Sequence, residues 1–373
     1  EVSAAVAKAA IESGVARKTI TDWDEYKNRL KQMLGQETKF TRTLHATAAL
    51  HPQRVVFAEG GHQTMMKAAV TALQEGICHP ILLGNPDRLN RLAKRLKLDL
   101  TGVEIVDMRA DKEQGRRATY AKHLAEKRAR QGVTFEEAYD KMYERNYFGM
   151  SMVEQGDADA FITGLYTKYS NTIKVAKEVI GVRKDYNTFA TMHILNSNRG
   201  TIYVADTLIN RHPNQDVLYD VARLSEHTVK FFNQDPVIAM VSYSNFGTDE
   251  VGSPVAVHQA VEKLQHDFPD MVVDGEMQVN FALNRELRDD KYPFTRLKGK
   301  DVNTIVFANM NAANSSYKLI QALDPDCEIV GPVQMGLNKP IHFTDFEASV
   351  SDVVNVTAVA VIDAYVDKVK KNK

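Results

Sequence analysis

From residue 54 onward, short apolar runs alternate with stretches of helical periodicity, and this alternation constrains the fold more than any other feature. In a first region, the runs that predict strands are residues 54–58, 79–84, 103–106 and 158–164. In a second region, about residues 186–332, they are residues 201–206, 236–241, 271–275 and 304–308. Repeated β-α-β units of this length place parallel strands in a sheet with helices on both faces. We therefore predict an α/β protein with mainly parallel sheets.

Helical periodicity fills the intervals between these runs. The stretches that predict helices are residues 63–74, 86–98, a long segment 113–155 and a last segment 351–368. The long segment is predicted to break near residues 131–132 and again near residues 146–149. The last helix is strongly apolar on one face, so we expect it to pack back onto the first region.

The size and composition of the chain exclude several classes of protein. A length of 373 residues suffices for two domains, and 44% hydrophobic with 25% charged residues is ordinary for a globular protein. A formal net charge of -1 gives no electrostatic reason to expect nucleic acid or an anionic membrane as a partner. No apolar run reaches the roughly 18 residues that a membrane span requires.

The two cysteines and the N-terminal segment indicate the setting of the chain. The chain has two cysteines, Cys78 at the end of a helix-like segment and Cys327 in a loop. Two cysteines are too few for a disulfide framework, so we predict structural thiols in a reducing cytoplasm. The first residues include neither an initiator Met nor a signal-peptide core, which we interpret as a cut inside a longer chain. Residues 1–36 are interpreted as a connector, with Thr21 or Asp22 capping a helix over residues 25–33.

Ligands of open α/β sheets bind outside the C-terminal ends of the strands, so the loops there are candidates for a site. The segment SYSNFGT at 242–248 follows a predicted strand and offers hydroxyl groups, an amide and a Gly, which suit phosphate or pyrophosphate. A polar capping loop explains this composition equally well. Asp274 and Glu276 come just after another predicted strand. Such a pair can do acid–base or metal chemistry, although a capped turn is the commoner meaning of the pattern.

Two loops near the C-terminus carry the clearest ligand-binding pattern. The first, NMNAANSSYK at 309–318, follows an apolar run, and the second, GPVQMGLNKP, spans 331–340. A strand that runs into an Asn- and Ser-rich turn and then a helix presents free backbone N–H groups and amides to an anion. Together the loops predict a site that holds a phosphorylated ligand.

Metal and nucleotide motifs do not occur in the sequence. The 11 histidines are scattered, and neither a His-Glu-x-x-His nor a Cys-x-x-Cys pattern exists. His62, close to Glu59 in a Gly-Gly turn, is the one histidine worth following, and we expect a structural role for it. Without a G-x-G-x-x-G or P-loop sequence, this segment is not expected to bind a nicotinamide cofactor or ATP in the standard ways.

Taken together, the loops resemble one family. The motifs are NYFGM at 146–150, GDADA at 156–160, SYS at 242–244, VDGEMQ at 273–278 and the two C-terminal loops. In this order they resemble the phosphate acetyl/butyryltransferase family over about residues 50–368. More narrowly, the chain resembles the C-terminal phosphotransacetylase-like domain of large bacterial NADP-dependent malic enzymes. Residues 1–33 resemble the end of a malic enzyme domain, and SNFG at 244–247 replaces the Lys-Gly form of the free-standing transferases.

The resemblance implies two three-layer α/β domains of the phosphotransacetylase and isocitrate/isopropylmalate dehydrogenase type, with the active cleft between them. It places an upstream tail and linker at residues 1–40, a first domain at 41–185 plus 333–373, and a second domain at 186–332. It also implies coenzyme A binding and a dimer formed through this domain. The predicted ligands for acyl-CoA or phosphate are Arg128, Lys174, Ser242, Ser244, Asn245, Asn309, Asn311, Asn314, Tyr317, Gln334 and Lys339.

Stand-alone members of the family transfer acetyl between acetyl phosphate and coenzyme A, using an Asp to activate the thiol and Arg and Ser to bind the phosphate. By resemblance the Asp falls on Asp352 and one arginine on Arg128, while a second arginine falls on Lys174. The family's Ser-Arg-Gly falls on Asp-Phe-Glu at 345–347. Arginine presents a fixed fork of N–H donors to an anion, and phenylalanine presents none. Two lost contacts, at about 2–4 kcal/mol each, predict transfer slowed by roughly 10³-fold or more.

The first hypothesis is that this segment binds acetyl-CoA or a related acyl-CoA as a regulatory ligand without turning it over. NADP, a divalent metal and the conversion of malate to pyruvate and CO2 would then belong to an upstream malic enzyme domain, and this segment would hold no cofactor. The alternative is an active phosphate acetyl/butyryltransferase that uses Arg128 and Lys174. A third hypothesis is a purely architectural dimerisation domain.

Overall fold

The computed structural model describes residues 2–14, 16, 20, 23, 26, 39–166, 168–197, 200–324 and 326–371. The chain forms two units, Glu1–Thr43 and Leu44–Lys373. Helix α1 (Val2–Glu12) belongs to the first unit, and helix α3 (Lys39–Leu50) begins within it. The predicted helix over 25–33 and its caps Thr21 and Asp22 lie outside the described residues, apart from Tyr26.

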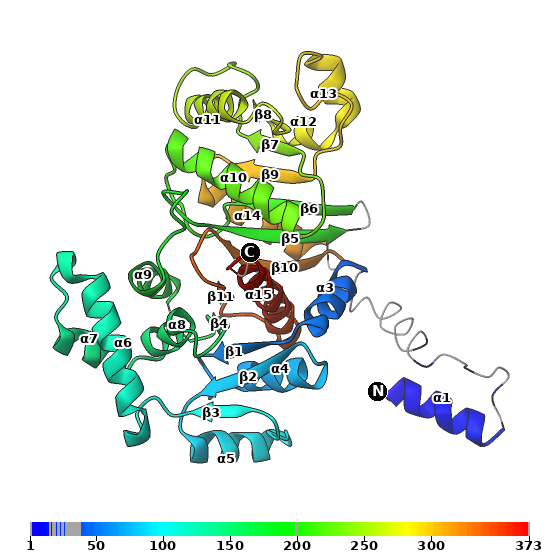
Figure 1. The fold of residues 1–373 in the computed structure, drawn as a ribbon. Coiled ribbons are helices and arrows are strands. Elements are labelled where there is room, and N and C mark those ends of the chain that lie inside the picture. Colours follow the sequence, from blue (N-terminus) through cyan, green and yellow to red (C-terminus); the bar gives the residue numbers. More distant parts are fainter. Residues whose placement is uncertain are drawn as a thin grey trace. The chain divides into compact units, whose positions relative to one another are not determined.

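Two sheets form the framework of the second unit (Figure 1). The first is parallel, in the order β11 (Ile341–Phe343), β4 (Ala160–Thr163), β1 (Gln53–Phe57), β2 (Cys78–Leu83) and β3 (Glu104–Val106). The order of the second is β10 (Glu328–Met335), β5 (Ala190–Ser197), β6 (Gly200–Ala205), β9 (Thr304–Phe307), β7 (Ile238–Val241) and β8 (Val273–Met277). In it, β5 runs antiparallel to both neighbours, while the other pairs are parallel. The predicted α/β class with mainly parallel sheets is confirmed.

Helices accompany both sheets. The helices between β1 and β5 in the chain are α4 (Gln63–Gln74), α5 (Pro86–Leu96), α6 (Gln114–Lys127), α7 (Phe135–Lys141), α8 (Arg145–Gln155) and α9 (Tyr169–Val179), with short 3-10 turns η1 (Asp111–Glu113) and η2 (Ala129–Gln131). Those between β6 and β10 are α10 (Gln215–Phe231), α11 (Ser253–Asp267), α12 (Val279–Leu283), α13 (Arg285–Lys291) and α14 (Met310–Leu323). None of the helices in the described part of the chain combines the length and apolar character needed to cross a bilayer. The domain boundaries within the second unit stay a prediction.

Helices α4 and α5 begin where local chemistry favours it. Asn85 caps α5 by accepting the Arg88 N–H at 3.1 Å, and Pro86 occupies the first turn, where no intrahelical N–H bond is lost. His62 caps α4, its Nδ1 accepting the Thr64 N–H at 3.3 Å. The helix predicted over residues 63–74 is confirmed, and His62 helps to begin it.

Several details differ from the predictions. Cys78 begins β2 instead of ending a helix, and both cysteines are buried free thiols. The break predicted at residues 146–149 is wrong, because these buried residues lie inside α8. Asp274 and Glu276 lie within β8 and not after it. Strands β5 and β10 were not predicted, although each has eight residues, and half of the predicted loop at 331–340 belongs to β10.

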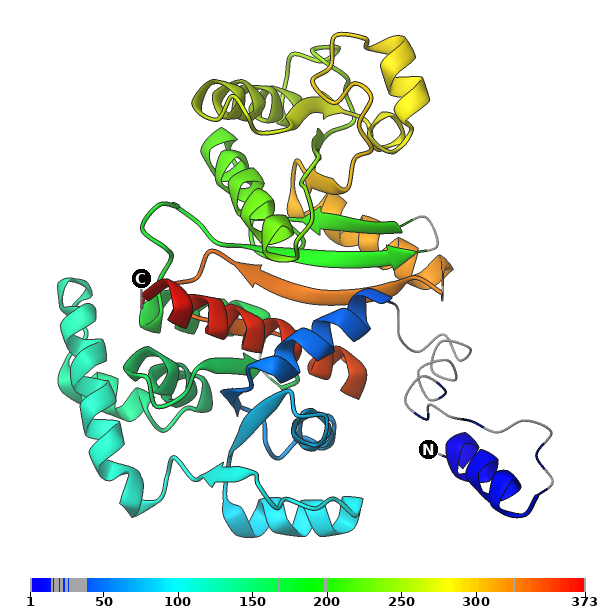
Figure 2. The ribbon, with the colours of Figure 1, turned by 45° about the vertical axis from the view of Figure 1, so that its right-hand side comes forward.

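The C-terminal segment joins the two sheets. The chain leaves β10 of the second sheet and, after residues 336–340, enters β11 of the first. Gln334 holds this crossing, since its Oε1 accepts the Phe343 N–H at 2.7 Å. Helix α15 (Val350–Lys371) then lies between the sheets and contacts β10, β1, β4 and α4 (Figure 2). The packing predicted for the last helix is confirmed.

Candidate functional site

A cavity of about 360 Å³ opens where β4 and β11 of the first sheet end. Its walls come from the segment after β4, the turn after β6 and the loop after β11 (residues 344–349, the β11 loop). The lining side chains are Leu165, Tyr166, Lys168, Tyr169, Leu208, Thr344, Asp345 and Phe346. Because five of these are aliphatic or aromatic, we call it the aromatic cavity. Its volume lies within the range of small-molecule pockets, about 300–1,000 Å³.

A buried carboxylate fixes the wall that follows β4. Glu59 is 1% exposed and accepts the Gly164 N–H at 3.1 Å and the Thr163 hydroxyl at 2.9 Å. Gly164 has φ +140°, and a Cβ there would overlap the Thr344 carbonyl oxygen, so the position requires glycine. The wall of the cavity is therefore rigidly placed against the β11 loop.

Asp345 and Phe346 form the rim of the cavity on the β11 loop. Phe346 is 71% exposed, and its N–H donates to the Asp345 carboxylate at 2.8 Å. The other oxygen of Asp345 accepts from the Lys318 ammonium of α14 at 2.7 Å. Burial lowers the pKa of Lys318, but the bond to Asp345 and the nearby charges outweigh it, so the pKa is raised. Lys318 is therefore a cation that already has a carboxylate partner.

A hollow of about 60 Å³ adjoins the aromatic cavity at Asp345. His193 of β5 and Tyr317 of α14 form its back, with their rings stacked at a centroid distance of 4.0 Å. His193 Nδ1 lies 2.9 Å from the Thr207 hydroxyl oxygen. Burial lowers the pKa of His193 to about 3, so its ring is neutral at physiological pH.

The hollow is predominantly acidic. Its described lining carries the carboxylates of Asp345, Glu347 and Asp352 against the single ammonium group of Lys318. Asp352 is also engaged at the start of α15, where its Oδ2 accepts the Ser349 N–H at 2.8 Å in a capping box. An anion placed here meets three carboxylates and one ammonium group.

Comparison with known proteins identifies the family. The family described as phosphate acetyl/butaryl transferase matches residues 39–361. The chain belongs to this family. A phosphate acetyltransferase of Thermoanaerobacterium thermosaccharolyticum is 30% identical over 325 residues, which are 85% of this chain and 97% of that protein. A phosphotransacetylase structure from Streptococcus pyogenes has a TM-score of 0.78 and 26% identity, covering 87% of this chain and 98% of that one.

The chain is also similar to malic enzymes. The NADP-dependent malic enzymes of Salmonella typhimurium and Escherichia coli are each 34% identical to it over 368 residues, or 98% of this chain. These residues are 48% of each malic enzyme, so the chain spans about half the length of these relatives. The predicted resemblance to the transferase family and to the malic enzymes is confirmed.

The loop after β7 (residues 242–248, the β7 loop), which resembles a family motif, closes around a carboxylate of its own chain. Glu276 of β8 is fully buried, and its Oε1 accepts the Gly247 N–H at 2.6 Å and the Ser244 hydroxyl at 3.3 Å. Its Oε2 lies 3.6 Å from the His258 ring. The backbone of Phe246 donates to the Glu276 carbonyl at 2.8 Å. Donors suited to an external phosphate are thus engaged with Glu276.

Of the other two predicted residues in the β7 loop, Asn245 bonds within the chain and Ser242 has no hydrogen-bond partner among the described residues. Asn245 Oδ1 accepts the Gln278 N–H at 2.8 Å, which ties the loop to the end of β8. The Ser242 hydroxyl oxygen is buried and has no hydrogen-bond partner among the described residues. These contacts resemble those of a capping loop, the alternative that the sequence left open.

The Asn- and Ser-rich motif at 309–318 is helix from Met310 onward and not a turn. Asn309 caps α14 by accepting the Ala312 N–H at 3.0 Å. Asn314 donates to the Thr207 carbonyl at 3.4 Å, while Asn311 is exposed. The motif therefore positions α14, which carries Tyr317 and Lys318 to the hollow.

Arg128 and Lys174, which the resemblance matched to two family arginines, lie at the C-cap of α6 and within α9. Lys174 is 65% exposed, 3.9 Å from Glu178, which also accepts the Tyr147 hydroxyl at 2.6 Å. Burial and the bond to Glu178 raise the pKa of Tyr147. Arg128 ends α6, and its buried Nε has no hydrogen-bond partner among the described residues. Neither residue lines the aromatic cavity or the hollow.

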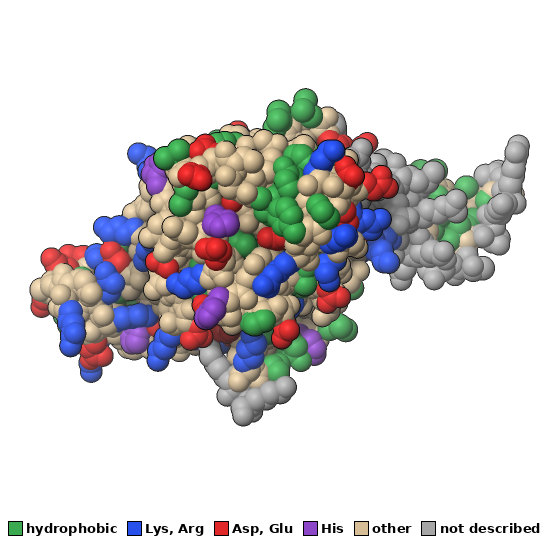
Figure 3. Space-filling view, turned by 90° about the horizontal axis from the view of Figure 1, so that it is seen from above, with side chains coloured by type: hydrophobic (Ala, Val, Ile, Leu, Met, Phe, Trp, Pro, Cys, Tyr) green, Lys and Arg blue, Asp and Glu red, His purple; other side chains and the backbone are tan. Residues whose placement is uncertain are grey.

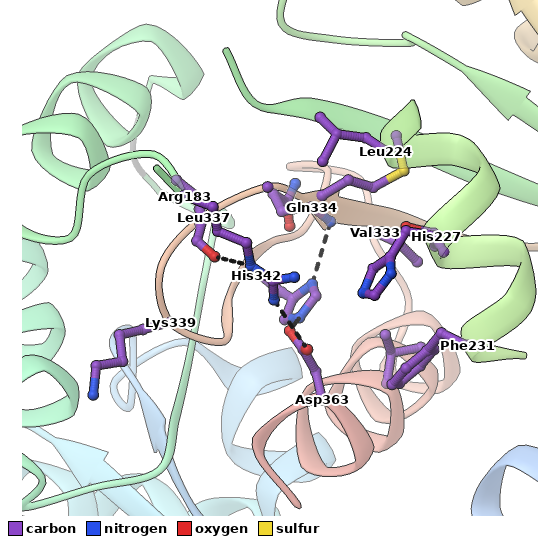
Figure 4. Close-up of a pocket in the computed structure, with 14 residues that line it drawn as sticks. Arg183, Leu224, His227, Phe231, Val333, Gln334, Leu337, Lys339, His342 and Asp363 are labelled. Carbon is purple, nitrogen blue, oxygen red and sulfur yellow. Dashed lines mark hydrogen bonds and ion pairs between the residues drawn. The ribbon is translucent and has the colours of Figure 1, made fainter. Parts of the chain in front are cut away.

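Gln334 and Lys339 line a third pocket, of about 40 Å³ (Figure 4). The Gln334 N–H donates to His342 Nδ1 at 3.3 Å, which places the proton of a neutral ring on Nε2, 3.8 Å from an oxygen of Asp363. Gln334 also supports the aromatic cavity, because its Nε2 donates to the Tyr169 hydroxyl at 3.2 Å. Gln334 thus holds a wall residue of the aromatic cavity without lining the cavity itself.

The structure brings together Tyr317, Asp345, Phe346 and Asp352 of the predicted residues. The predicted residues that line neither the cavity nor the hollow are Arg128, Lys174, Ser242, Ser244, Asn245, Asn309, Asn311, Asn314, Gln334 and Lys339. Tyr166, Leu208, His193 and Lys318 were not predicted, although Lys318 belongs to a motif that the sequence singled out. Within the described residues, no group of three or more His, Cys, Asp or Glu side chains could hold a metal ion.

Proposed function

We propose that this chain binds an acyl-CoA, with acetyl-CoA as the first candidate, and does not transfer the acyl group to phosphate. The ligand would regulate a malic enzyme domain joined to this one. The observation that carries the proposal is the rim of the aromatic cavity, which Phe346 and Asp345 form. The sequence resemblance assigns these two residues to the positions of the family's Arg and Ser. The cavity gives room for a ligand, and the rim gives no support to a phosphoryl anion.

The argument against transfer is electrostatic. Acyl transfer to or from phosphate needs cationic or N–H donors at the developing charge, and each lost donor costs about 2–4 kcal/mol. No arginine is among the described residues that line the cavity or the hollow. Lys318 is held by Asp345 at 2.7 Å, and Glu347 and Asp352 add negative charge. The described lining of the two spaces thus carries three carboxylates against two ammonium groups, those of Lys168 and Lys318, so a phosphate meets a net negative charge there.

The regulatory part of the proposal is supported by the relatives. The NADP-dependent malic enzymes match this chain over about half of their length. An acyl-CoA could act on a joined catalytic domain only if it binds two conformations of the whole protein with different affinity. In this proposal NADP and a divalent metal belong to the joined domain, the protein is cytoplasmic, and this chain contributes the acyl-CoA site.

Calorimetry and a transfer assay on the chain test the proposal together. We expect acetyl-CoA and coenzyme A to bind to the chain. With acetyl phosphate and coenzyme A as substrates, we expect a turnover number far below the roughly 1–10³ s⁻¹ that is typical of enzymes. Turnover of a few per second would establish the alternative, an active transferase that uses Arg128 and Lys174. No heat and no thermal shift with either ligand would remove the binding role. In a protein that joins this chain to a malic enzyme domain, acetyl-CoA should change the rate of NADP reduction by malate.

Exposed apolar side chains favour a second candidate function, a dimerisation domain. Leu319 and Leu323 of α14 are 60% and 74% exposed. Leu283 and Phe294, around α12 and α13, are 52% and 68% exposed, and hydrophobic side chains gather on this face in Figure 3. Sedimentation equilibrium tests this function, because Leu323→Lys should weaken a dimer that uses α14 while acyl-CoA binding is unchanged.

A further inference from the structure

We propose that the third pocket, the one of about 40 Å³, binds a small 2-hydroxycarboxylate. Its walls come from α10, the end of β10, the segment 336–340, β11 and α15. None of its described lining residues also lines the aromatic cavity or the acidic hollow. The pocket takes residues from the segment that enters β11, whereas the aromatic cavity takes residues from the loop that leaves it. It is therefore a separate site, and its ligand is not the proposed acyl-CoA.

His342 of β11 presents an unmet hydrogen-bond donor to this pocket (Figure 4). Its side chain is 1% exposed, and its Nδ1 accepts the Gln334 N–H at 3.3 Å, so the neutral ring carries its proton on Nε2. Nε2 is buried and has no hydrogen-bond partner among the described residues, because the Asp363 oxygen at 3.8 Å lies beyond hydrogen-bond length. Buried N–H groups are nearly always paired, so this donor favours an acceptor atom on a ligand.

Arg183 and Asp363 border the same space without closing on each other. The Arg183 Nε donates to the Leu337 carbonyl at 3.0 Å, which fixes the guanidinium at the pocket wall. Its Nη2 lies 3.8 Å from Asp363 Oδ1 and 3.9 Å from an oxygen of Asp367. Both distances exceed the range of about 2.7–3.2 Å for an N–H···O hydrogen bond, so the Nη2 hydrogens can still donate to a ligand. The Asp363 carboxylate thus lies 3.8 Å from a donor on either side, Arg183 and His342.

These three groups suit a carboxylate that has a hydroxyl group on the next carbon. Its carboxylate oxygens can accept from the Arg183 guanidinium and from His342 Nε2, and its hydroxyl can donate to Asp363. A primary ammonium ligand would donate to Asp363 but would face the guanidinium and leave His342 Nε2 without an acceptor. The hydroxy acid is therefore the ligand that gives all three groups a hydrogen bond.

The charge of the lining also favours an anion. The described lining has the Arg183 guanidinium and the Lys339 ammonium against the single carboxylate of Asp363. Figure 4 shows the Lys339 ammonium directed away from His342, so Arg183 is the cation that a ligand would meet. Burial lowers the pKa of His227, and its ring therefore adds no charge to the pocket at neutral pH.

The pocket is small, and its walls are held in place. A space of 40 Å³ takes roughly three water molecules, at about 10–15 Å³ of space for each water centre, which limits the ligand to an acid of two or three carbons. Leu224, Phe231 and Val359 supply apolar surface for these carbons. The Arg183 N–H donates to the Gly336 carbonyl at 2.9 Å, which anchors the segment between β10 and β11. A wall that is already in position costs little to order on binding.

Nuclear magnetic resonance titration of the chain, with isotope-labelled histidine, tests the site with acetate, glycolate, L-lactate and methylammonium, each against matched sodium chloride. We expect glycolate and L-lactate to shift the ring signals of His342 and to bind roughly fivefold more tightly than acetate, the gain from one further hydrogen bond. Methylammonium should cause no shift. No shift with any of the acids, or a shift that chloride reproduces, would overturn the site and leave the proposed acyl-CoA function standing. Equal affinity for acetate and glycolate would overturn the hydroxy-acid class.

Two variants locate the contacts, and His342→Gln assigns the ring signals by their loss. Arg183→Gln removes the guanidinium and should weaken the binding of both acetate and glycolate about tenfold or more. Asp363→Ala removes the acceptor of the ligand hydroxyl, so the ratio of glycolate to acetate affinity should fall to about one while acetate still binds. Arg285→Gln on α13 is the matched control, because Arg285 is 47% exposed, pairs with Asp301 and lies outside the pocket lining. It should keep the wild-type affinities.

Circular dichroism checks that each variant is folded. If Arg183→Gln does not fold, the affinity ratio of Asp363→Ala decides, and an unchanged ratio would overturn the site. Wild-type affinity for both acids in a folded Arg183→Gln variant would also overturn it.

Discussion

The β7 loop and the β11 loop both follow parallel strands and both carry polar residues, yet they use them differently. In the β7 loop the Gly247 N–H and the Ser244 hydroxyl point inward and donate to the buried Glu276. The β11 loop directs Phe346 outward, 71% exposed, beside a cavity of about 360 Å³. Its Asp345 pairs with Lys318, a residue of another element.

This contrast shows that polar composition at the end of a strand does not by itself indicate a binding site. Donors that face a carboxylate of the same chain are satisfied before any ligand arrives, and displacing that carboxylate would leave it buried and unpaired. The β11 loop also has internal hydrogen bonds, through Asp345 and Asp352, but its Phe346 side chain is exposed beside a cavity and is available for contact. The β7 loop is therefore held together by its own chain, whereas the proposed function needs the β11 loop to contact the ligand.

The largest expected effect comes from restoring the family pattern in the β11 loop. The triple variant Asp345→Ser, Phe346→Arg, Glu347→Gly adds a guanidinium and removes two carboxylates where an oxyanion would form. We expect the rate of acetyl transfer from acetyl phosphate to coenzyme A to rise about 10²- to 10³-fold. A coupled assay of thioester formation measures it.

The control for the added guanidinium is Phe135→Arg, which places the same group on α7, at a residue outside the cavity lining. It should leave transfer at the wild-type level. A triple variant that folds normally by circular dichroism and shows no gain would mean that the β11 loop does not contact the reacting group. Wild-type activity equal to that of the triple variant would show that Phe346 imposes no block.

The second effect concerns stability and the β7 loop. Glu276→Ala removes two hydrogen bonds to a carboxylate and leaves the Gly247 N–H without its acceptor, so unfolding free energy should fall by about 3 kcal/mol. Glu276→Gln keeps an acceptor and should cost less than half as much. Urea denaturation measures both.

Glu262→Ala is a matched control, because Glu262 pairs with the same His258 but is 68% exposed. It should change the unfolding free energy by less than about 0.5 kcal/mol. If Glu276→Ala behaved like this surface variant, the β7 loop would not depend on its buried carboxylate. Its donors would then be available to an external anion.

The sequence predicted the parallel strands other than the three-residue β11 because their apolar runs are continuous. It failed for β5 and β10 for physical reasons. β5 is buried at seven of eight positions but contains Thr191 and His193, which find partners in Asp206 and Thr207 only after β6 folds beside them. β10 contains Pro332, which sits where its register against β5 shifts. Such a bulge tolerates proline, a residue that otherwise indicates a loop.

The site was predictable only in part. The family resemblance drew attention to Phe346, which lines the cavity, while its match to a family arginine stays a prediction. Tyr166 and Leu208 could not be found in this way, because the walls of the cavity come from segments far apart in the chain and no motif marks either residue. Nor could the sequence show that the donors of the β7 loop bond to Glu276 of β8, since that depends on how two neighbouring strands align.

The third effect is a pH dependence that arises behind the β11 loop. Burial lowers the pKa of His193 to about 3, against about 6.5 in an unfolded chain. Below about pH 6.5 the His193 ring binds a proton in the unfolded chain but stays neutral in the native protein. The unfolding free energy therefore decreases as the pH falls from about 6.5 toward 3, and His193 causes no such loss above that range. The slope should be about 1.4 kcal/mol per pH unit.

His193→Asn removes the titrating ring and offers an oxygen near the Thr207 hydroxyl. Between about pH 6 and 4, the slope of unfolding free energy against pH should therefore decrease by about 1.4 kcal/mol per pH unit. His266→Asn, on an exposed side chain of α11, should retain the wild-type slope. Urea denaturation at a series of pH values compares them. Equal slopes in the wild type and His193→Asn would mean that the ring behind the hollow takes up protons in the native protein.

The smallest effect decides whether the β11 loop is truly more open than the β7 loop. The Lys318 and Asp345 side chains are 38% and 30% exposed, so solvent screens their ion pair despite its 2.7 Å distance. A double-mutant cycle with Lys318→Met and Asp345→Asn should give a coupling free energy of only about 0.5–1 kcal/mol in urea denaturation. A coupling free energy of about 3 kcal/mol, as large as the loss expected for Glu276→Ala, would mean that both loops are held by a strong contact within the chain. The β11 loop would then be closed by Lys318 as the β7 loop is closed by Glu276, and a ligand would have to break that contact before it could enter.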